Sequence, residues 1–222
     1  MQKRGNKFFN IIITICILAL IAVIGYVSYY YISRYIALKQ AETAVDEFEN
    51  NVIVVAIEDE PVQNEIENVI ENPQETVKTD NGNATNRNNI RYKNYTTIGT
   101  IRIPKTKVKA PIVDQVTPTS ISAAAAVLYG PGLNQVGNTV IVAHNYRNGT
   151  FFSNNKKLVV GDTIYITDSN GNKIEYSVTK TYITDEFDFS YATRDTEGKR
   201  EISLSTCTTD PTKRLVIWAK EI

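Results

Sequence analysis

The fold is decided by the C-terminal stretch EISLSTCTTDPTKRLVIWAK, residues 201–220. Its two apolar segments, EISLST and RLVIWAK, have the length of strands, and Thr208-Thr209-Asp210-Pro211 between them is typical of a turn. The stretch therefore predicts a β-hairpin close to the C-terminus.

Side-chain alternation divides the first of these strands into two faces. One face carries Ile202, Leu204 and Thr206, and the other carries Ser203, Ser205 and Cys207. We expect the apolar face to lie in the core, which turns Cys207 away from the interior and toward a surface of small hydroxyl side chains. A free cysteine is usually a small buried hydrophobe. The serines that share its face argue against that interpretation.

Further strands are expected upstream of the hairpin. GDTIYIT (161–167) and NKIEYSVTK (172–180) are joined through Asn170-Gly171, the strongest short-range hairpin signal. NTVIVAH, residues 138–144, is a continuous apolar run of strand length, which predicts a strand buried on both faces with His144 at its end. Two shorter β-like segments, 97–104 and 108–114, begin the folded domain.

One short helix is expected after these first strands. Thr119-Ser120 offers an N-cap for ISAAAAVLY (121–129), whose alanines favour a helix that Gly130-Pro131-Gly132 would end. We therefore predict a mainly β fold over residues 95–222: a closed barrel of about seven or eight strands with one or two short helices.

The N-terminal part predicts a membrane anchor. Residues 11–32 form an uncharged apolar run long enough to cross a bilayer as a helix. Three basic residues in the segment 1–10 predict a cytoplasmic N-terminus, with the rest of the chain outside. Residues 33–57 are expected to form a helical stalk, and residues 58–94 a polar flexible linker.

Composition restricts the partners and the cofactors. The 24 basic and 24 acidic residues balance, so nucleic-acid binding is not expected. A structural zinc site needs about four ligands, and Cys16, Cys207 and His144 are the only cysteines and histidine. The carboxylates Asp185, Glu186 and Asp188 lack the spacing of a specific calcium loop. We expect neither a metal nor another cofactor.

Three residues suggest nucleophilic chemistry. Cys16 lies in the membrane run, so Cys207 is a lone thiol in the outside domain, and such thiols are often reactive. Arg214 begins the strand after the turn, so pairing across the hairpin brings its guanidinium near Cys207, where it could stabilise a thiolate or an oxyanion. Lys213 is an alternative cation that points to the opposite face. His144 at a strand end could serve as the base.

These residues resemble the sortase family. SLSTC at 203–207 is similar to the family signature TLxTC with serine at its first position, and the order of GTIRIP, GNTVIVAHN and LVVGDTIYI also matches. The resemblance implies that Cys207 is the nucleophile, His144 the general acid/base and Arg214 the oxyanion and substrate clamp. It also implies that Ser205, Thr206 and Asn145 bind substrate.

The implied function is that of a membrane-anchored cysteine transpeptidase. It would cleave an LPxTG-like C-terminal sorting motif of secreted proteins through a thioacyl intermediate, and an amine of a cell-wall precursor or a pilin would then resolve it. HNYRNGTFF (144–152) and LSTC resemble class B, although the segment 185–199 is shorter than the insertion usual in that class.

Two alternatives remain open from the sequence. The first is a non-catalytic, membrane-anchored domain that binds a cell-surface partner. The second is another cysteine enzyme, either a peptidase or an L,D-transpeptidase. An L,D-transpeptidase normally has histidine and glycine before its cysteine, whereas Ser205-Thr206 precede Cys207 here.

Overall fold

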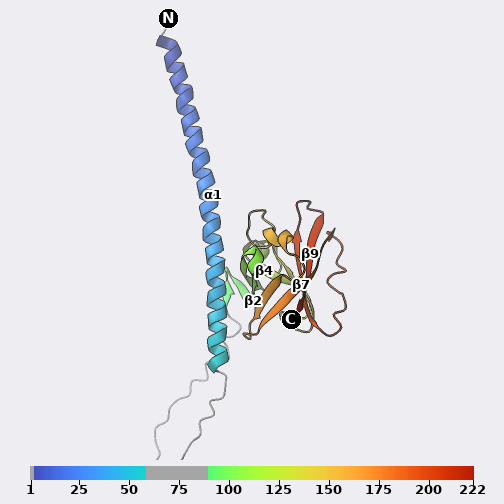
Figure 1. Cartoon of the computed structure of the whole chain (residues 1–222). Helices are drawn as coiled ribbons and strands as arrows, with labels where there is room; N and C mark the ends of the chain where they lie inside the picture. The colour runs from blue at the N-terminus through green and yellow to red at the C-terminus, as the bar shows by residue number, and fades with distance from the viewer. Residues whose placement is uncertain (1–2, 59–89) are drawn as a thin grey trace, which may run out of the picture. The chain divides into compact units, whose positions relative to one another are not determined.

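A computed structural model of the chain describes residues 3–58 and 90–222 (Figure 1). The chain divides into two compact units, Met1–Gln40 and Ala41–Ile222. The larger part of the predicted linker, residues 59–89, lies outside the described residues.

The predicted membrane run and stalk form one continuous helix, α1 (Lys3–Glu58). Among the described residues, this is the one helix long and apolar enough to cross a membrane, and its most apolar window has a mean hydropathy of 2.8 with no part buried. Large apolar side chains from Phe8 to Leu38 are exposed, as they would be in a helix made for lipid contact. This composition allows α1 to serve as a membrane anchor.

Residues 90–222 form a closed barrel. Its strands are β2 (Tyr95–Ile103), β3 (Val108–Val113), β4 (Ala125–Tyr129), β5 (Gly137–Val142), β6 (Thr163–Asp168), β7 (Lys173–Asp185), β8 (Arg200–Cys207) and β9 (Lys213–Glu221). They are ordered β2-β3-β4-β5-β8-β9-β7-β6, and β6 pairs with β2 to close the barrel. The short β1 (Arg91–Tyr92) pairs with β2. The predicted mainly β barrel is confirmed.

Few helical residues accompany the strands. They form the α-helix α2 (Pro118–Ala123) and the 3₁₀ turns η1 (Pro104–Thr106) and η2 (Phe152–Lys157). Two strand pairs, β3–β4 and β5–β8, are parallel, and the other pairs of the barrel are antiparallel. The barrel interior is filled by branched apolar side chains, of which Ile101, Ile141, Ile164, Ile202 and Leu204 are almost completely buried.

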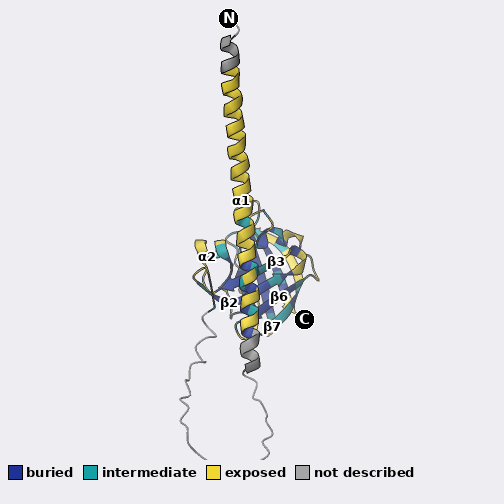
Figure 2. Cartoon of the chain, turned by 90° about the vertical axis from the view of Figure 1, so that its left-hand side faces the viewer, coloured by how far each residue is buried: buried dark blue, intermediate teal, exposed yellow. Residues whose placement is uncertain are grey.

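The last turns of α1 belong to the barrel unit. Ala41, Val45, Phe48 and Val52 recur at helical spacing and are buried. Beside them, Arg102 of β2 donates to both carboxylate oxygens of Glu49, at 2.9 and 2.7 Å. Figure 2 shows dark blue, buried stretches in the part of α1 that lies beside the barrel. The predicted stalk is therefore partly packed against the barrel.

The predicted helix over 121–129 is wrong in its position. The helix begins one residue after Thr117, whose hydroxyl accepts from the backbone N–H of Ser120 at 3.0 Å, and it ends at Ala123. Residues 125–129 instead form β4, which pairs with both β3 and β5. Ala125 and Ala126 are completely buried there. Strand pairing and burial outweigh the weak intrinsic preference of alanine for helix.

Leu204 and Leu128 allow a matched test of this core. Leu204→Ala removes a side chain that is 1% exposed inside the barrel, whereas Leu128→Ala alters one that is 39% exposed. We expect Leu204→Ala to lower the free energy of unfolding by about 2–5 kcal/mol and Leu128→Ala by less than about 1 kcal/mol. Urea denaturation followed by tryptophan fluorescence measures both, and equal losses would contradict the assigned core.

Candidate active site

Parallel pairing of β5 and β8 brings together the ends that carry the predicted histidine and cysteine. Val142 lies opposite Ser205 in the ladder, and the Thr206 hydroxyl extends the alignment by donating to the backbone carbonyl of Ala143 at 2.7 Å. His144 directly follows Ala143, just as Cys207 directly follows Thr206. The two residues therefore leave the barrel side by side at the same edge.

Side chains of the segment after His144 fix this arrangement. The Asn145 amide donates to the Cys207 carbonyl oxygen at 2.8 Å, and the Arg147 guanidinium donates to the Thr209 carbonyl at 2.9 Å. The Asn145 side-chain oxygen accepts from the Arg147 backbone N–H at 3.1 Å. Asn145 thus links the histidine segment to the cysteine backbone, and its predicted contact with substrate stays a prediction.

His144 lies in a half-buried aromatic environment. Its ring lies 4.9 Å, centroid to centroid, from that of Tyr146 at a tilt of 39°, and the Tyr146 ring lies 6.0 Å from that of Phe151. Its carbonyl accepts from the backbone N–H of Phe152 at 3.1 Å. Removal of water from the ring lowers the pKa of His144 below its usual 6.5. The imidazole is then mainly uncharged at neutral pH, which is the form that accepts a proton.

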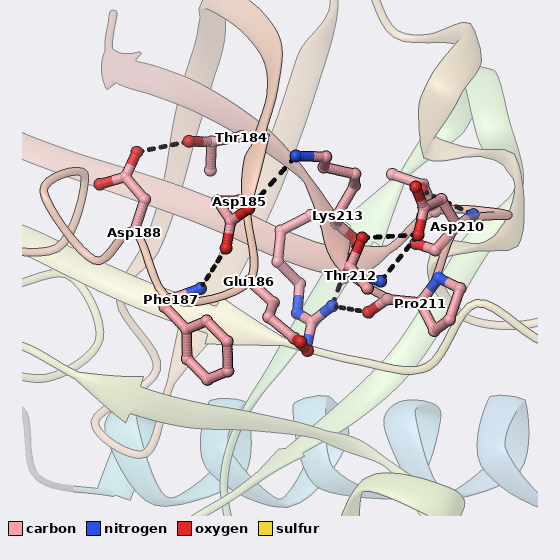
Figure 3. A network of polar contacts seen from close by, with 11 residues as sticks. Thr184, Asp185, Glu186, Phe187, Asp188, Asp210, Pro211, Thr212 and Lys213 are labelled. Carbon is pink, nitrogen blue, oxygen red and sulfur yellow. Dashed lines mark hydrogen bonds and ion pairs between the residues drawn. The ribbon is translucent and has the colours of Figure 1, made fainter.

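Arg214 lies directly opposite Cys207 in the β8–β9 ladder, so the two side chains leave the same face. Its Nη1 donates to the carbonyl oxygens of Pro211 and Lys213, at 2.7 and 3.2 Å, and its Nη2 donates to Glu186 at 3.1 Å. Lys213, the alternative cation, instead pairs with Asp185 at 3.2 Å (Figure 3). Among the described residues, Arg214 is the cation that the ladder places beside the thiol.

The expected open surface of hydroxyl groups beside Cys207 is wrong. Ser203 is fully buried, and Ser205 is 4% exposed with its hydroxyl oxygen accepting from the Tyr191 hydroxyl at 3.2 Å. Tyr191 and Ala192, from the segment between β7 and β8, pack with Val140 and Val216 of the two strands that flank β8, and Tyr191 contacts Ser205. Cys207 is the first residue of β8 that is exposed.

Ser205 and Thr206 are therefore both buried, with their hydroxyl groups bonded within the protein. Their predicted contact with substrate stays a prediction, and the contacts seen hold the end of β8 in place. Two residues near the thiol were missed in the sequence. Tyr191 belongs to the aromatic series FDFSY, a recognisable sign of a covering segment, whereas the sequence around Glu186 gives no sign of its contact with Arg214.

Comparison with known protein families matches residues 101–222 to the sortase domain. This chain belongs to the sortase family. The members of the family are cysteine transpeptidases, and the barrel is the sortase fold. No curated protein sequence matches the chain.

Solved sortase structures match the same barrel. Sortase A from Corynebacterium diphtheriae is 27% identical with a TM-score of 0.53, over 58% of this chain and 61% of that one. A pilus-related sortase C of Group B Streptococcus is 32% identical with a TM-score of 0.52, over 57% of this chain and 67% of that one. A Clostridium perfringens sortase D5 transpeptidase is 26% identical with a TM-score of 0.51, over 57% and 79%. The class B-like features of this chain stay a prediction.

A titration of His144 tests the assigned environment. Because it is the one histidine of the chain, its ring protons give a single set of NMR signals. We expect a pKa below 6.5, since desolvation disfavours the charged ring. The contribution of the uncharged His144 ring to the free energy of unfolding is fully present above pH 6.5. It is lost as the pH falls through the lowered pKa. A pKa above 6.5 would contradict this environment.

Proposed function

We propose that this protein is a membrane-anchored transpeptidase in which Cys207 is the nucleophile, His144 the general acid/base and Arg214 the oxyanion donor. The observation that carries the proposal is that the ends of β5 and β8 and the start of β9 lie at the same edge of the barrel as the exposed thiol of Cys207. Cys207 pairs with Arg214 across β8–β9, and the parallel β5–β8 register brings His144 to the same edge. This arrangement has the nucleophile, base and cation that acyl transfer requires.

In the first half-reaction, His144 accepts the thiol proton and the sulfur of Cys207 attacks the carbonyl carbon of a peptide bond. The resulting oxyanion accepts hydrogen bonds from Arg214, which stabilise the negative charge as it develops. The carbon–nitrogen bond then breaks, and His144 returns the proton to the leaving amine. The acyl group remains on Cys207 as a thioester.

In the second half-reaction, an amine attacks the thioester carbonyl carbon. His144 takes a proton from the attacking nitrogen, a new amide bond forms, and the carbon–sulfur bond breaks. The proton held by His144 then restores the thiol. No other reactant is needed, because one amide bond is exchanged for another.

The proposed substrates are secreted proteins that carry an LPxTG-like C-terminal sorting motif. The proposed acceptors are amines of a cell-wall precursor or a pilin. The family membership supports both, and the pilus-related sortase among the solved structures supports the pilin acceptor. An extracytoplasmic barrel would meet these reactants at the membrane surface.

Reporter peptides test the chemistry in the full chain solubilised in detergent. LPxTG-like and NPQTN-like peptides are incubated with and without an amine acceptor, and the ligated product and the acyl-enzyme are measured by mass spectrometry. Cys207→Ala should abolish both, while Cys16→Ala, the matched control, should leave both unchanged. His144→Ala should lower the rate about 10²–10⁴-fold, and Arg214→Ala about 10²–10³-fold.

Other outcomes would assign the protein differently. Hydrolysis that is indifferent to added amine would favour a cysteine peptidase. Absence of an acyl-enzyme on Cys207 with every sorting peptide would contradict the proposed reaction.

Membrane attachment has a separate test. The full chain should sediment with membranes and resist extraction by high salt, whereas a chain that begins at residue 33 should remain soluble. This shorter chain retains residues 41–52, whose apolar side chains pack against the barrel, so the barrel should stay folded. Protease added outside intact cells should remove the barrel if the N-terminus is cytoplasmic, and protection would contradict that orientation.

A further inference from the structure

Arg214 is held from two sides. Its Nη1 is anchored on the turn between β8 and β9, through the carbonyl oxygens of Pro211 and Lys213. Its Nη2 is held by the Glu186 carboxylate, which comes from a different part of the chain. Three of the five N–H groups of a guanidinium are therefore used. Within residues 90–222, the Nε–H and the second Nη2–H of Arg214 have no hydrogen-bond acceptor.

Glu186 is itself fixed in place. It directly follows β7, and its backbone N–H donates to the Thr212 carbonyl at 2.9 Å. The register of β7 and β9 places Thr184 opposite Arg214, two residues before Glu186. Two further contacts lie at this junction between β7 and the segment that follows it: Asp185 pairs with Lys213, and Asp188 accepts from the Thr184 hydroxyl, as Figure 3 shows. The carboxylate therefore approaches Arg214 from a constrained backbone.

The ion pair has partial protection from water. The side chains of Arg214 and Glu186 are 25% and 28% exposed, whereas those of Lys213 and Asp185 in the neighbouring pair are 43% and 53% exposed. An ion pair with less exposure is screened less by solvent and salt. Glu186 can therefore restrain the guanidinium more effectively than its neighbour restrains the ammonium of Lys213.

We propose that Glu186 is a positioning residue that orients Arg214 for catalysis. With one guanidinium nitrogen on the turn and another on Glu186, rotation about the end of the side chain is blocked. The two N–H groups without an assigned partner are then kept in a fixed direction for the oxyanion or the peptide. Donors oriented in advance stabilise a transition state without reorganisation during the reaction. This inference rests on the proposed transpeptidase function.

Substitution of Glu186 should act on the chemical step. In Glu186→Ala, Arg214 keeps its contacts with the turn but loses its second anchor. We expect kcat to fall about tenfold, less than for loss of Arg214 itself, with KM changed less than about twofold. Glu186→Gln retains an oxygen acceptor without the charge, so it should recover part of the lost kcat. Ligation rates over a range of peptide concentrations separate the two constants.

Asp185→Asn is the matched control. It neutralises the adjacent carboxylate, whose ion-pair partner is Lys213 rather than Arg214, and it keeps an oxygen that can accept from the Phe187 backbone N–H. We expect its kcat and KM to stay within about twofold of the wild type, because exposed ion pairs contribute little. Equal losses of kcat in Asp185→Asn and Glu186→Ala would indicate general disturbance of the junction and would overturn the proposal.

A spectroscopic measurement separates this inference from the proposed function. The Nε–H signal of Arg214 is assigned in the full chain in detergent by its loss in Arg214→Lys, and its mobility is measured by ¹⁵N relaxation. Mobility should increase in Glu186→Ala and stay unchanged in Asp185→Asn. Unchanged mobility in Glu186→Ala would overturn the positioning role, whether or not the wild type transfers peptides.

The kinetic outcomes are equally distinct. A wild type that forms no acyl-enzyme would contradict the proposed function, while the relaxation measurement would still decide whether Glu186 restrains Arg214. If the wild type ligates peptides and Glu186→Ala has the same kcat, the inference about Glu186 is overturned and the proposed function is not. Faster ligation in Glu186→Ala would also overturn it, because Glu186 would then compete with the peptide for Arg214.

Discussion

The site depends on the parallel pairing of β5 and β8. Parallel strands end at the same edge of a sheet, so residues that continue from both strands emerge together. The pairing is extensive, from Gly137 opposite Arg200 to Val142 opposite Ser205. A shift by one residue would turn Ile202 and Leu204 out of the core and would separate His144 from Cys207. The apolar core therefore determines the register on which the candidate chemistry depends.

The outer face of β8 is stabilised by polar contacts instead. The Ser203 hydroxyl donates to Asn138, whose amide group donates to the carbonyl oxygens of Tyr191 and Ala192. Arg194 of the same segment forms an ion pair with the buried Glu201. The segment between β7 and β8 is thereby attached to the barrel by its side chains and backbone. Glu186 is the first residue of this segment. It is therefore held on a rigid scaffold although it lies outside the strands.

Local patterns in the sequence predict the strands well, because alternation and turn residues act within a few positions. The hairpin through Asn170-Gly171 and the C-terminal hairpin that ends β8 at Cys207 both follow from such signals. Non-local effects are harder to predict. Ala125 and Ala126 become strand residues because β3 and β5 pair with them, and Ser205 is buried because Tyr191 covers it. Glu186 meets Arg214 across 28 residues, with no local pattern to announce the pair.

The position of Cys207, the proposed nucleophile, meets two requirements of such a residue, which must be accessible and also held in a fixed geometry. Exposure changes abruptly at this residue, because Thr206 is 5% exposed and the cysteine after it is exposed. Its backbone is nevertheless restrained on both sides, by Arg214 in the β9 ladder and by the Asn145 amide on its carbonyl oxygen. A thiol placed farther into the turn would lose the ladder, and one placed farther back in β8 would be covered. The end of the strand is therefore the place where a fixed backbone and an accessible sulfur coincide.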